Sequence, residues 1–117
     1  STWFLPRLIG HTRAMQLILM NDMLTAEKAL EWGLVNEVLD DEQLMTRTLE
    51  VAHQLAEGPT LAYGEAKRLV ADSHSNTLET QMELETRAIC GLARASADTK
   101  EGIDAFTNKR KPTFKGE

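Results

Sequence analysis

The chain has 117 residues, of which 42% are hydrophobic, and a net charge of −5, which fits one domain of ordinary globular composition. Residues 107–117 carry four basic side chains and one acidic one, so the acidic excess lies in the rest of the chain. An acidic body with one short basic end argues against a nucleic-acid-binding surface. No apolar run resembles a signal peptide or a membrane span, so the sequence predicts a cytoplasmic protein with no membrane partner.

The N-terminal segment predicts two short helices. Trp3 to Ile9 form an apolar cluster that Gly10 ends. The next helix is expected from Thr12 to Met20 because apolar residues recur there at helical spacing. Asn21 follows as a left-handed C-terminal residue, a conformation that Asn adopts more readily than most residues.

A third short helix and a connector come next. Thr25 is a good N-cap for a helix from Ala26 to Trp32, and Gly33 is a matching stop. The stretch "GLVNEVL" that follows could be a short extended segment or an apolar connector, and we favour the connector. Such short helices are marginal alone, so they need a partner to pack on.

Longer helices are expected in the rest of the chain, three of them beginning at residue pairs with capping-box spacing. Their expected extents are Asp40 to Glu57, Thr60 to Asp72, Asn76 to Ala95 and Asp98 to Arg110, with capping boxes at Asp40–Gln43, Asn76–Glu79 and Asp98–Glu101. The sequence therefore predicts an all-α chain. We expect one helical region over 1–117, with short helices over about 1–39 and long ones over 40–117.

No catalytic or metal-binding constellation stands out. Glu50 and His53 have the spacing of a Glu-x-x-His element, but a di-metal site needs that element twice, so we interpret them as helix surface. Cys90 is the only cysteine and is expected to be a small buried residue. The sequence thus predicts no metal, no covalently bound cofactor and no catalytic residue in this chain.

Two stretches together resemble the crotonase (enoyl-CoA hydratase/isomerase) superfamily. They are "LPRLIGHTRAMQLILMNDMLTAEKALEWGLVNEVL" and "SADTKEGIDAFTNKRKPTFKG", with "GPTLAYGEAKRLV" between them. The resemblance covers nearly the whole chain, and "SNTLETQMELE" and "RASADTKEG" are most similar to the branch of epoxyphenylacetyl-CoA isomerases. Met20-Asn21 replaces the usual Thr-Gly of the family.

The resemblance implies that this chain is the helical C-terminal part of a crotonase-type α/β spiral fold, without its ββα core. That core would carry the oxyanion-binding N–H groups and the proton-transferring carboxylates, so the chain alone is expected to be inactive. By resemblance, the short helices of about residues 1–39 complete the core, and the long helices of residues 40–117 form the trimerisation and coenzyme A-binding part. Lys109, Arg110 and Lys111 match the positions that bind coenzyme A, and Phe106 matches a residue that packs the terminal helix.

The expected partners are an acyl-CoA, in which coenzyme A is part of the substrate, the missing N-terminal core, and other copies in a trimer or dimer of trimers. The reaction implied is water addition to an enoyl-CoA, or a double-bond shift in it, through a stabilised enolate. Two alternatives stay open from the sequence: a non-catalytic helical oligomerisation module, and an independent helical bundle that binds an anionic ligand.

Overall fold

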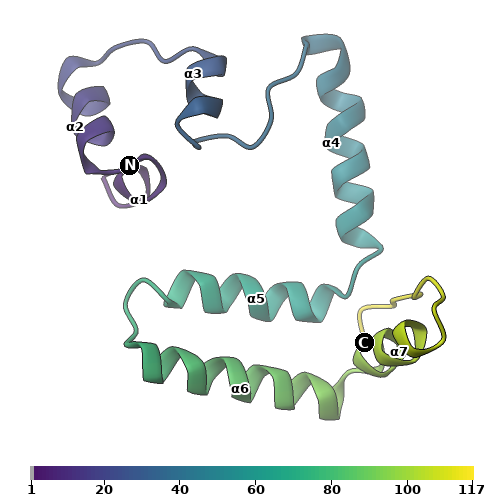
Figure 1. Ribbon diagram of the computed structural model, residues 1–117. Coiled ribbons are helices and arrows are strands. Elements are labelled where there is room, and N and C mark those ends of the chain that lie inside the picture. The colour runs from purple at the N-terminus through teal and green to yellow at the C-terminus, as the bar shows by residue number, and fades with distance from the viewer. Residues whose placement is uncertain (1) are drawn as a thin grey trace. The chain divides into compact units, whose positions relative to one another are not determined.

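The regular structure of the computed structural model, which describes residues 2–117, is entirely helical (Figure 1). The helices are α1 (Phe4–Ile9), α2 (His11–Met20), α3 (Ala26–Glu31), α4 (Asp41–Ala56), α5 (Thr60–Asp72), α6 (Leu78–Ala95) and α7 (Ala97–Thr107). No strand occurs among residues 2–117, so the predicted all-α class is confirmed and "GLVNEVL" is a connector.

The chain divides into two compact units, Ser1–Met45 and Thr46–Glu117, and the boundary falls inside α4. The first unit contains the three short helices, and the second contains the hairpin of α5 and α6 together with α7 and the C-terminal segment. The expected division of the chain at about residue 39 into a core-completing and a trimerisation part remains a prediction.

In the first unit, α1 packs against α2 around the buried side chains of Ile9 and Ala14. Gly10 joins the two helices with a φ of 82°, and Asn21 ends α2 at a φ of 54°, as its residue type predicted. The Thr25 hydroxyl accepts a hydrogen bond from the Lys28 N–H, which confirms it as the N-cap of α3.

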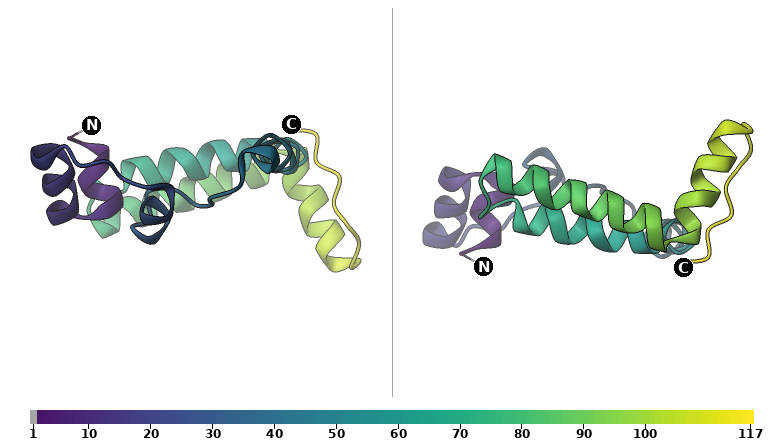
Figure 2. Two further views of the ribbon diagram at one scale, coloured as in Figure 1. Left: turned by 90° about the horizontal axis from the view of Figure 1, so that it is seen from above. Right: turned by 90° about the horizontal axis from the view of Figure 1, so that it is seen from below.

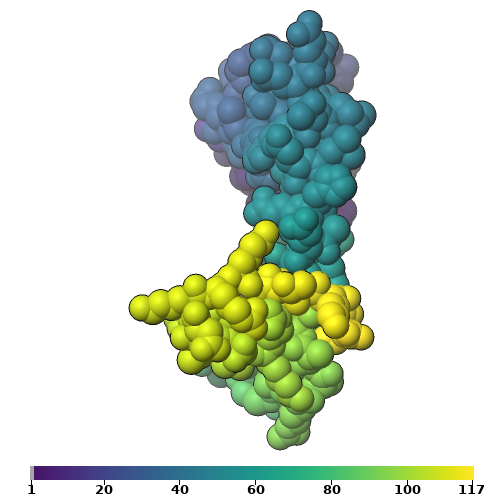
Figure 3. Space-filling view, turned by 90° about the vertical axis from the view of Figure 1, so that its right-hand side faces the viewer, coloured from purple at the N-terminus to yellow at the C-terminus, as the bar shows by residue number. Residues whose placement is uncertain are grey.

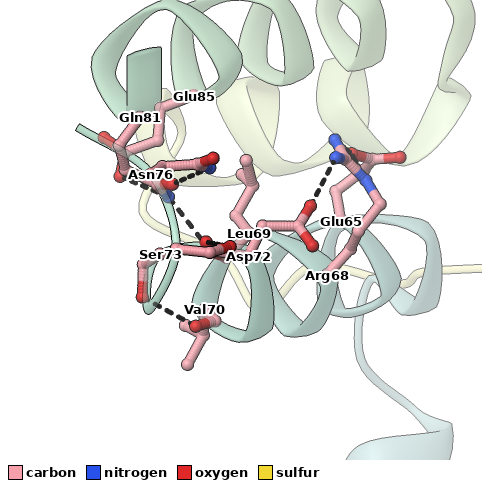
Figure 4. Close-up of polar contacts among 10 residues, drawn as sticks. Glu65, Arg68, Leu69, Val70, Asp72, Ser73, Asn76, Gln81 and Glu85 are labelled. Atoms are coloured by element: carbon pink, nitrogen blue, oxygen red, sulfur yellow. Dashed lines mark hydrogen bonds and ion pairs between the residues drawn. The ribbon is translucent and has the colours of Figure 1, made fainter. Parts of the chain in front are cut away.

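In the second unit, α5 and α6 run antiparallel and side by side (Figure 2). Gln81 of α6 donates from Nε2 to the carbonyl of Leu69 on α5 at 3.1 Å and accepts from Asn76 Nδ2 at 3.0 Å (Figure 4). The side chain of Arg68 on α5 pairs with Glu65 and Asp72 of the same helix. The Gln81 bonds thus tie the loop between α5 and α6 to both helices, whereas the Arg68 pairs lie within α5.

Two of the predicted capping boxes are wrong. The N-cap of α6 is Thr77, one residue later than expected, because the Thr77 hydroxyl accepts from the Thr80 N–H, whereas Asn76 bonds Gln81 instead. Helix α7 begins at Ala97 with Ser96 as N-cap. The Asp98 carboxylate accepts a hydrogen bond from the Lys115 N–H instead of capping the helix. Cys90 is exposed rather than buried, because α6 turns that side away from α5.

The chain leaves much apolar surface open to solvent. Among the described residues only four hydrophobic side chains are buried, and three of them are alanines. The accessible surface is 9409 Å², whereas two separate compact domains of the sizes of these units would expose about 7,600 Å². Large exposed side chains lie on the longer helices: Leu44, Met45, Leu49, Leu78, Met82, Ile89, Ile103 and Phe106. Exposed apolar faces of this kind are typical of surfaces on which helices pack.

None of the helices in the described part of the chain combines the length and the apolar character that crossing a membrane requires.

Candidate functional site

The end of α7 is set by Lys109, which has a left-handed φ of 53°. The Lys109 N–H donates to the Phe106 carbonyl at 3.3 Å and the Arg110 N–H to the Ala105 carbonyl at 3.0 Å. These two bonds form a Schellman motif, in which Gly is the usual left-handed residue. The helix therefore ends at Thr107 rather than near Arg110 as predicted, and Lys109, Arg110 and Lys111 form a turn beyond it, here called the basic turn.

Three carboxylates spaced three residues apart lie along α7 and face the basic turn and the chain that follows it. These residues, Asp98, Glu101 and Asp104, are here called the acidic face. Arg110 binds Glu101 through two hydrogen bonds of 2.6 and 2.7 Å, and Asp104 through one of 2.6 Å. A planar guanidinium matches a carboxylate in this two-pronged way. The hydrogen bonds from the Arg110 guanidinium contribute most to lowering the pKa of Glu101 to about 2. The carboxylates of Glu101 and Asp104 in turn raise the pKa of Arg110.

After the basic turn the chain returns along α7 to its start (Figure 2). The yellow atoms of this end lie against the yellow-green atoms of α7 in Figure 3. The Thr113 N–H donates to Glu101 Oε1 at 2.8 Å, and the Lys115 and Gly116 N–H groups donate to the two oxygens of Asp98 at 2.7 and 2.8 Å. Residues 112–117 are here called the returning segment. Three of its backbone N–H groups are bound by the acidic face, and the two that bind Asp98 help to leave this residue only 4% exposed.

The end of the returning segment is bound from both sides. The Glu117 carbonyl accepts from the Asp98 N–H and the Ser96 hydroxyl, each at 3.0 Å. Gly116 has a φ of 77°, and a Cβ there would lie 2.8 Å from the Thr60 hydroxyl oxygen. Glycine suits this position, because the backbone conformation and the close approach of the Thr60 side chain would both strain a larger residue.

The structure brings the three predicted coenzyme A-binding residues into one turn but gives them different surroundings. The Arg110 guanidinium is held by two carboxylates. Lys111 Nζ lies 3.9 Å from Glu57 Oε2, and both side chains are largely exposed, so this contact is weak. Lys109 has no ion pair among residues 2–117. The role of the three residues in coenzyme A binding stays a prediction.

Phe106 is 87% exposed, so it packs on little within the described chain. It borders a mostly apolar cavity of about 370 Å³. The lining residues are Pro59, Ala62, Ser96, Asp98, Thr99, Gly102, Ile103, Phe106 and Phe114. Inside the chain it is Phe114 that lies over α7, since its ring would meet a Cβ on Gly102 at 3.6 Å. The packing role predicted for Phe106 therefore stays a prediction that requires another chain or segment.

The acidic face was not identified from the sequence. Carboxylates at spacing three share one side of a helix, but their partners lie in the segment beyond the helix, and spacing alone does not indicate them. Elsewhere, Glu50 pairs with Arg47 at 3.3 Å on the surface of α4. No group of three metal-binding side chains lies together in the part of the chain that the structure describes.

Comparisons with known proteins agree along the whole chain. The family model described as enoyl-CoA hydratase/isomerase matches residues 1–117. The chain is 45% identical over 116 residues to a 1,2-epoxyphenylacetyl-CoA isomerase of Escherichia coli K12, covering 99% of this chain and 44% of that protein. It is 39% identical over 89 residues to a 4-chlorobenzoyl coenzyme A dehalogenase of an Arthrobacter species, covering 76% of this chain and 32% of that protein.

Solved structures give the same result. The crystal structure of an enoyl-CoA hydratase from Bacillus anthracis is similar with a TM-score of 0.90 and 35% identity, over 99% of this chain and 45% of that one. The chain thus spans less than half the length of these relatives.

Proposed function

This chain belongs to the enoyl-CoA hydratase/isomerase family, and we propose that it works as the C-terminal part of an acyl-CoA hydratase or isomerase. The observation that carries the proposal is the pattern of coverage. The isomerase and the solved hydratase each match 99% of this chain, whereas the chain spans only 44% and 45% of their lengths. The remaining part of such an enzyme would be a core N-terminal to residue 1.

The reaction would be addition of water to an enoyl-CoA thioester, or a shift of its double bond, through an enolate. The N–H groups that stabilise the enolate oxygen and the carboxylates that move protons would come from the upstream core. Each oxyanion donor contributes roughly 10²- to 10³-fold in rate. We therefore expect no activity from residues 1–117 alone.

This chain would supply part of the coenzyme A site and the surface between subunits. The proposed phosphate contacts are Lys109 and Lys111, since an ammonium group is a compact cation that suits a phosphate. Support comes from the lack of an ion pair at Lys109 among the described residues and from the weak, exposed contact of Lys111. Coenzyme A would be part of the substrate rather than a bound cofactor.

The narrower assignment is to the branch of 1,2-epoxyphenylacetyl-CoA isomerases, and it rests on the 45% identical relative. The relatives named above share the coenzyme A thioester and differ in the acyl group. The branch assignment is tested by comparing the turnover of an epoxyphenylacetyl-CoA with that of a straight-chain enoyl-CoA by the intact protein. Faster turnover of the straight-chain substrate would remove the branch assignment and leave the family.

The alternative function is a helical oligomerisation module without chemistry. The exposed apolar residues of α4, α6 and α7 favour it, because they would be buried between copies. Size exclusion with light scattering on residues 1–117 tests this surface, and we expect trimers or larger assemblies. A well-folded monomer that binds no hydrophobic dye would contradict both the alternative and the proposed subunit contacts.

Two comparisons test the enzyme proposal. The coding sequence upstream of Ser1 should encode a ββα core with a glycine-rich oxyanion segment. The intact protein should turn over an enoyl-CoA, whereas purified residues 1–117 should not. An upstream sequence without such a core would leave the oligomerisation module as the function, and turnover by residues 1–117 alone would show that the catalytic groups lie within them.

A further inference from the structure

Arg110 occupies a different position in the site from the two lysines beside it. Its two terminal nitrogens donate to Glu101 at 2.6 and 2.7 Å and to Asp104 at 2.6 Å. Nη1 also donates to the Lys111 carbonyl at 3.3 Å. The four N–H groups on its two terminal nitrogens are therefore already used inside the chain. A phosphate could reach them only by displacing a carboxylate from a charge-assisted pair.

The same carboxylate also holds the chain on the far side of Lys111. Glu101 Oε1 accepts from Arg110 Nη1 and from the Thr113 N–H at 2.8 Å. On the near side, the Lys109 and Arg110 N–H groups are fixed to the last carbonyls of α7. The backbone of residues 109–113 is thus anchored at both ends, and Pro112 restricts it further.

We propose that Glu101 and Arg110 are positioning residues of the anion site, holding the basic turn so that Lys109 and Lys111 face one phosphate-bearing ligand. This inference rests on the proposed coenzyme A function and changes the role expected for Arg110. Arg110 links the basic turn to the acidic face and does not touch the ligand. Holding the turn before binding reduces the conformational entropy that the ligand would otherwise have to offset.

Electrostatics alone predicts the opposite effect of Glu101. A carboxylate next to two lysines repels a phosphate, so its neutralisation should strengthen anion binding if Glu101 has no positioning role. If Glu101 holds the turn, neutralising it should weaken binding instead. The sign of the change therefore separates the two roles.

The experiment measures the Kd of coenzyme A by calorimetry on the intact protein and on the variants Glu101→Gln, Arg110→Lys and the double variant. We expect each single change to weaken binding by about fivefold and the double change to be no worse than either, as for residues of one network. Lysine keeps the charge of Arg110 but loses the two-pronged geometry. Glu31→Gln, which removes an exposed charge at the end of α3, is the matched control and should bind as the wild type.

The outcomes are distinct. Unchanged or tighter binding by Glu101→Gln, or wild-type binding by Arg110→Lys, would overturn the positioning role and leave the proposed function. A wild-type protein that does not bind coenzyme A would overturn the proposed function and this inference with it. Thermal unfolding of each variant checks its fold, and if Glu101→Gln does not fold, Arg110→Lys decides alone because it retains every charge.

Discussion

Arg110 and Glu101, nine residues apart in sequence, form a two-pronged ion pair at the end of α7. The pair shows that the basic end of the chain is not a freely solvated tail. The charge of Arg110 is met by Glu101 and Asp104 of the helix that precedes it, and three backbone N–H groups of the returning segment are bound by Glu101 and Asp98. The cations that remain accessible are lysines, which are the side chains left to bind an anion.

The ion pair predicts how the returning segment responds to acid. Hydrogen bonds from Arg110, then from the Thr113 N–H, lower the pKa of Glu101 from 4.5 to about 2, while the Asp104 carboxylate shares Arg110. Because the pKa is lower in the folded state, the stabilisation from Glu101 is fully present above about pH 4.5. It is lost as the pH falls toward 2.

An NMR titration of the Thr113 amide checks this prediction. Its chemical shift should be constant from pH 8 to 5 and should change with a midpoint near pH 2. In Arg110→Met the midpoint should move up toward the ordinary value of 4.5, since the largest cause of the shift is gone. A wild-type midpoint near 4.5 would show that the pair is not formed in solution.

Asp98 is expected to hold the end of the returning segment. Asn at this position keeps one acceptor and places an amide donor against a backbone N–H, so Asp98→Asn should weaken the local docking by about 2 kcal/mol. Hydrogen exchange at the Lys115 and Gly116 amides should then accelerate by about 30-fold. Exchange within α5 should not change, and Asp22→Asn, at an exposed position, is the matched control.

Faster exchange throughout α5 and α6 in Asp98→Asn would instead mean that Asp98 supports the whole second unit. Unchanged exchange at Lys115 and Gly116 would mean that the returning segment does not dock on α7.

Much of the helical arrangement is predictable from local signals, whereas the binding of the returning segment to the acidic face is not. Thr25, Asn21 and Gly33 act within one turn of the chain, where residue type largely determines conformation. Asp98 is of a residue type that often caps helices, but its carboxylate accepts hydrogen bonds from N–H groups seventeen and eighteen residues away. Spacing along the sequence does not indicate whether a carboxylate caps its own helix or binds N–H groups of a distant segment.

Burial was predicted least well, for a related physical reason. Cys90 lies on a helix whose apolar pattern suggests a covered face, yet its side chain is exposed because only one side of α6 meets α5. Phe106 likewise has an apolar pattern and an exposed ring. A hydrophobic stripe predicts that a face will be covered, but not by which chain.

Two glycines of the second unit should respond in opposite ways to alanine. A Cβ at the buried Gly58 would overlap the ring of Tyr63, whereas a Cβ at Gly64 within α5 meets nothing within 4 Å. Gly58→Ala should lower the free energy of unfolding by about 1 kcal/mol, since the partly exposed ring can move aside. Gly64→Ala should raise it by about 0.5–1 kcal/mol through helix propensity.

Chemical denaturation of both variants measures these changes, and Tyr63→Ala supplies the control. In that background Gly58→Ala should cost nothing, because the ring that it displaces is absent. A cost that persists without the Tyr63 ring would assign the effect to the backbone at Gly58.

Lys109 should show a trade-off between stability and binding. Its φ of 53° is one that most side chains adopt at a cost, so Lys109→Gly should stabilise the intact protein by about 1 kcal/mol. The same change removes the proposed phosphate contact and should weaken coenzyme A binding by about tenfold.

Asn21→Gly is the matched control, because Asn21 has a φ of 54°, tolerates it better, and lies in the other unit. Its stability should change less and its coenzyme A affinity not at all. Thermal unfolding and calorimetry on the three proteins give both quantities. A destabilised Lys109→Gly would contradict the left-handed end of α7, and wild-type affinity in that variant would remove Lys109 from the proposed site.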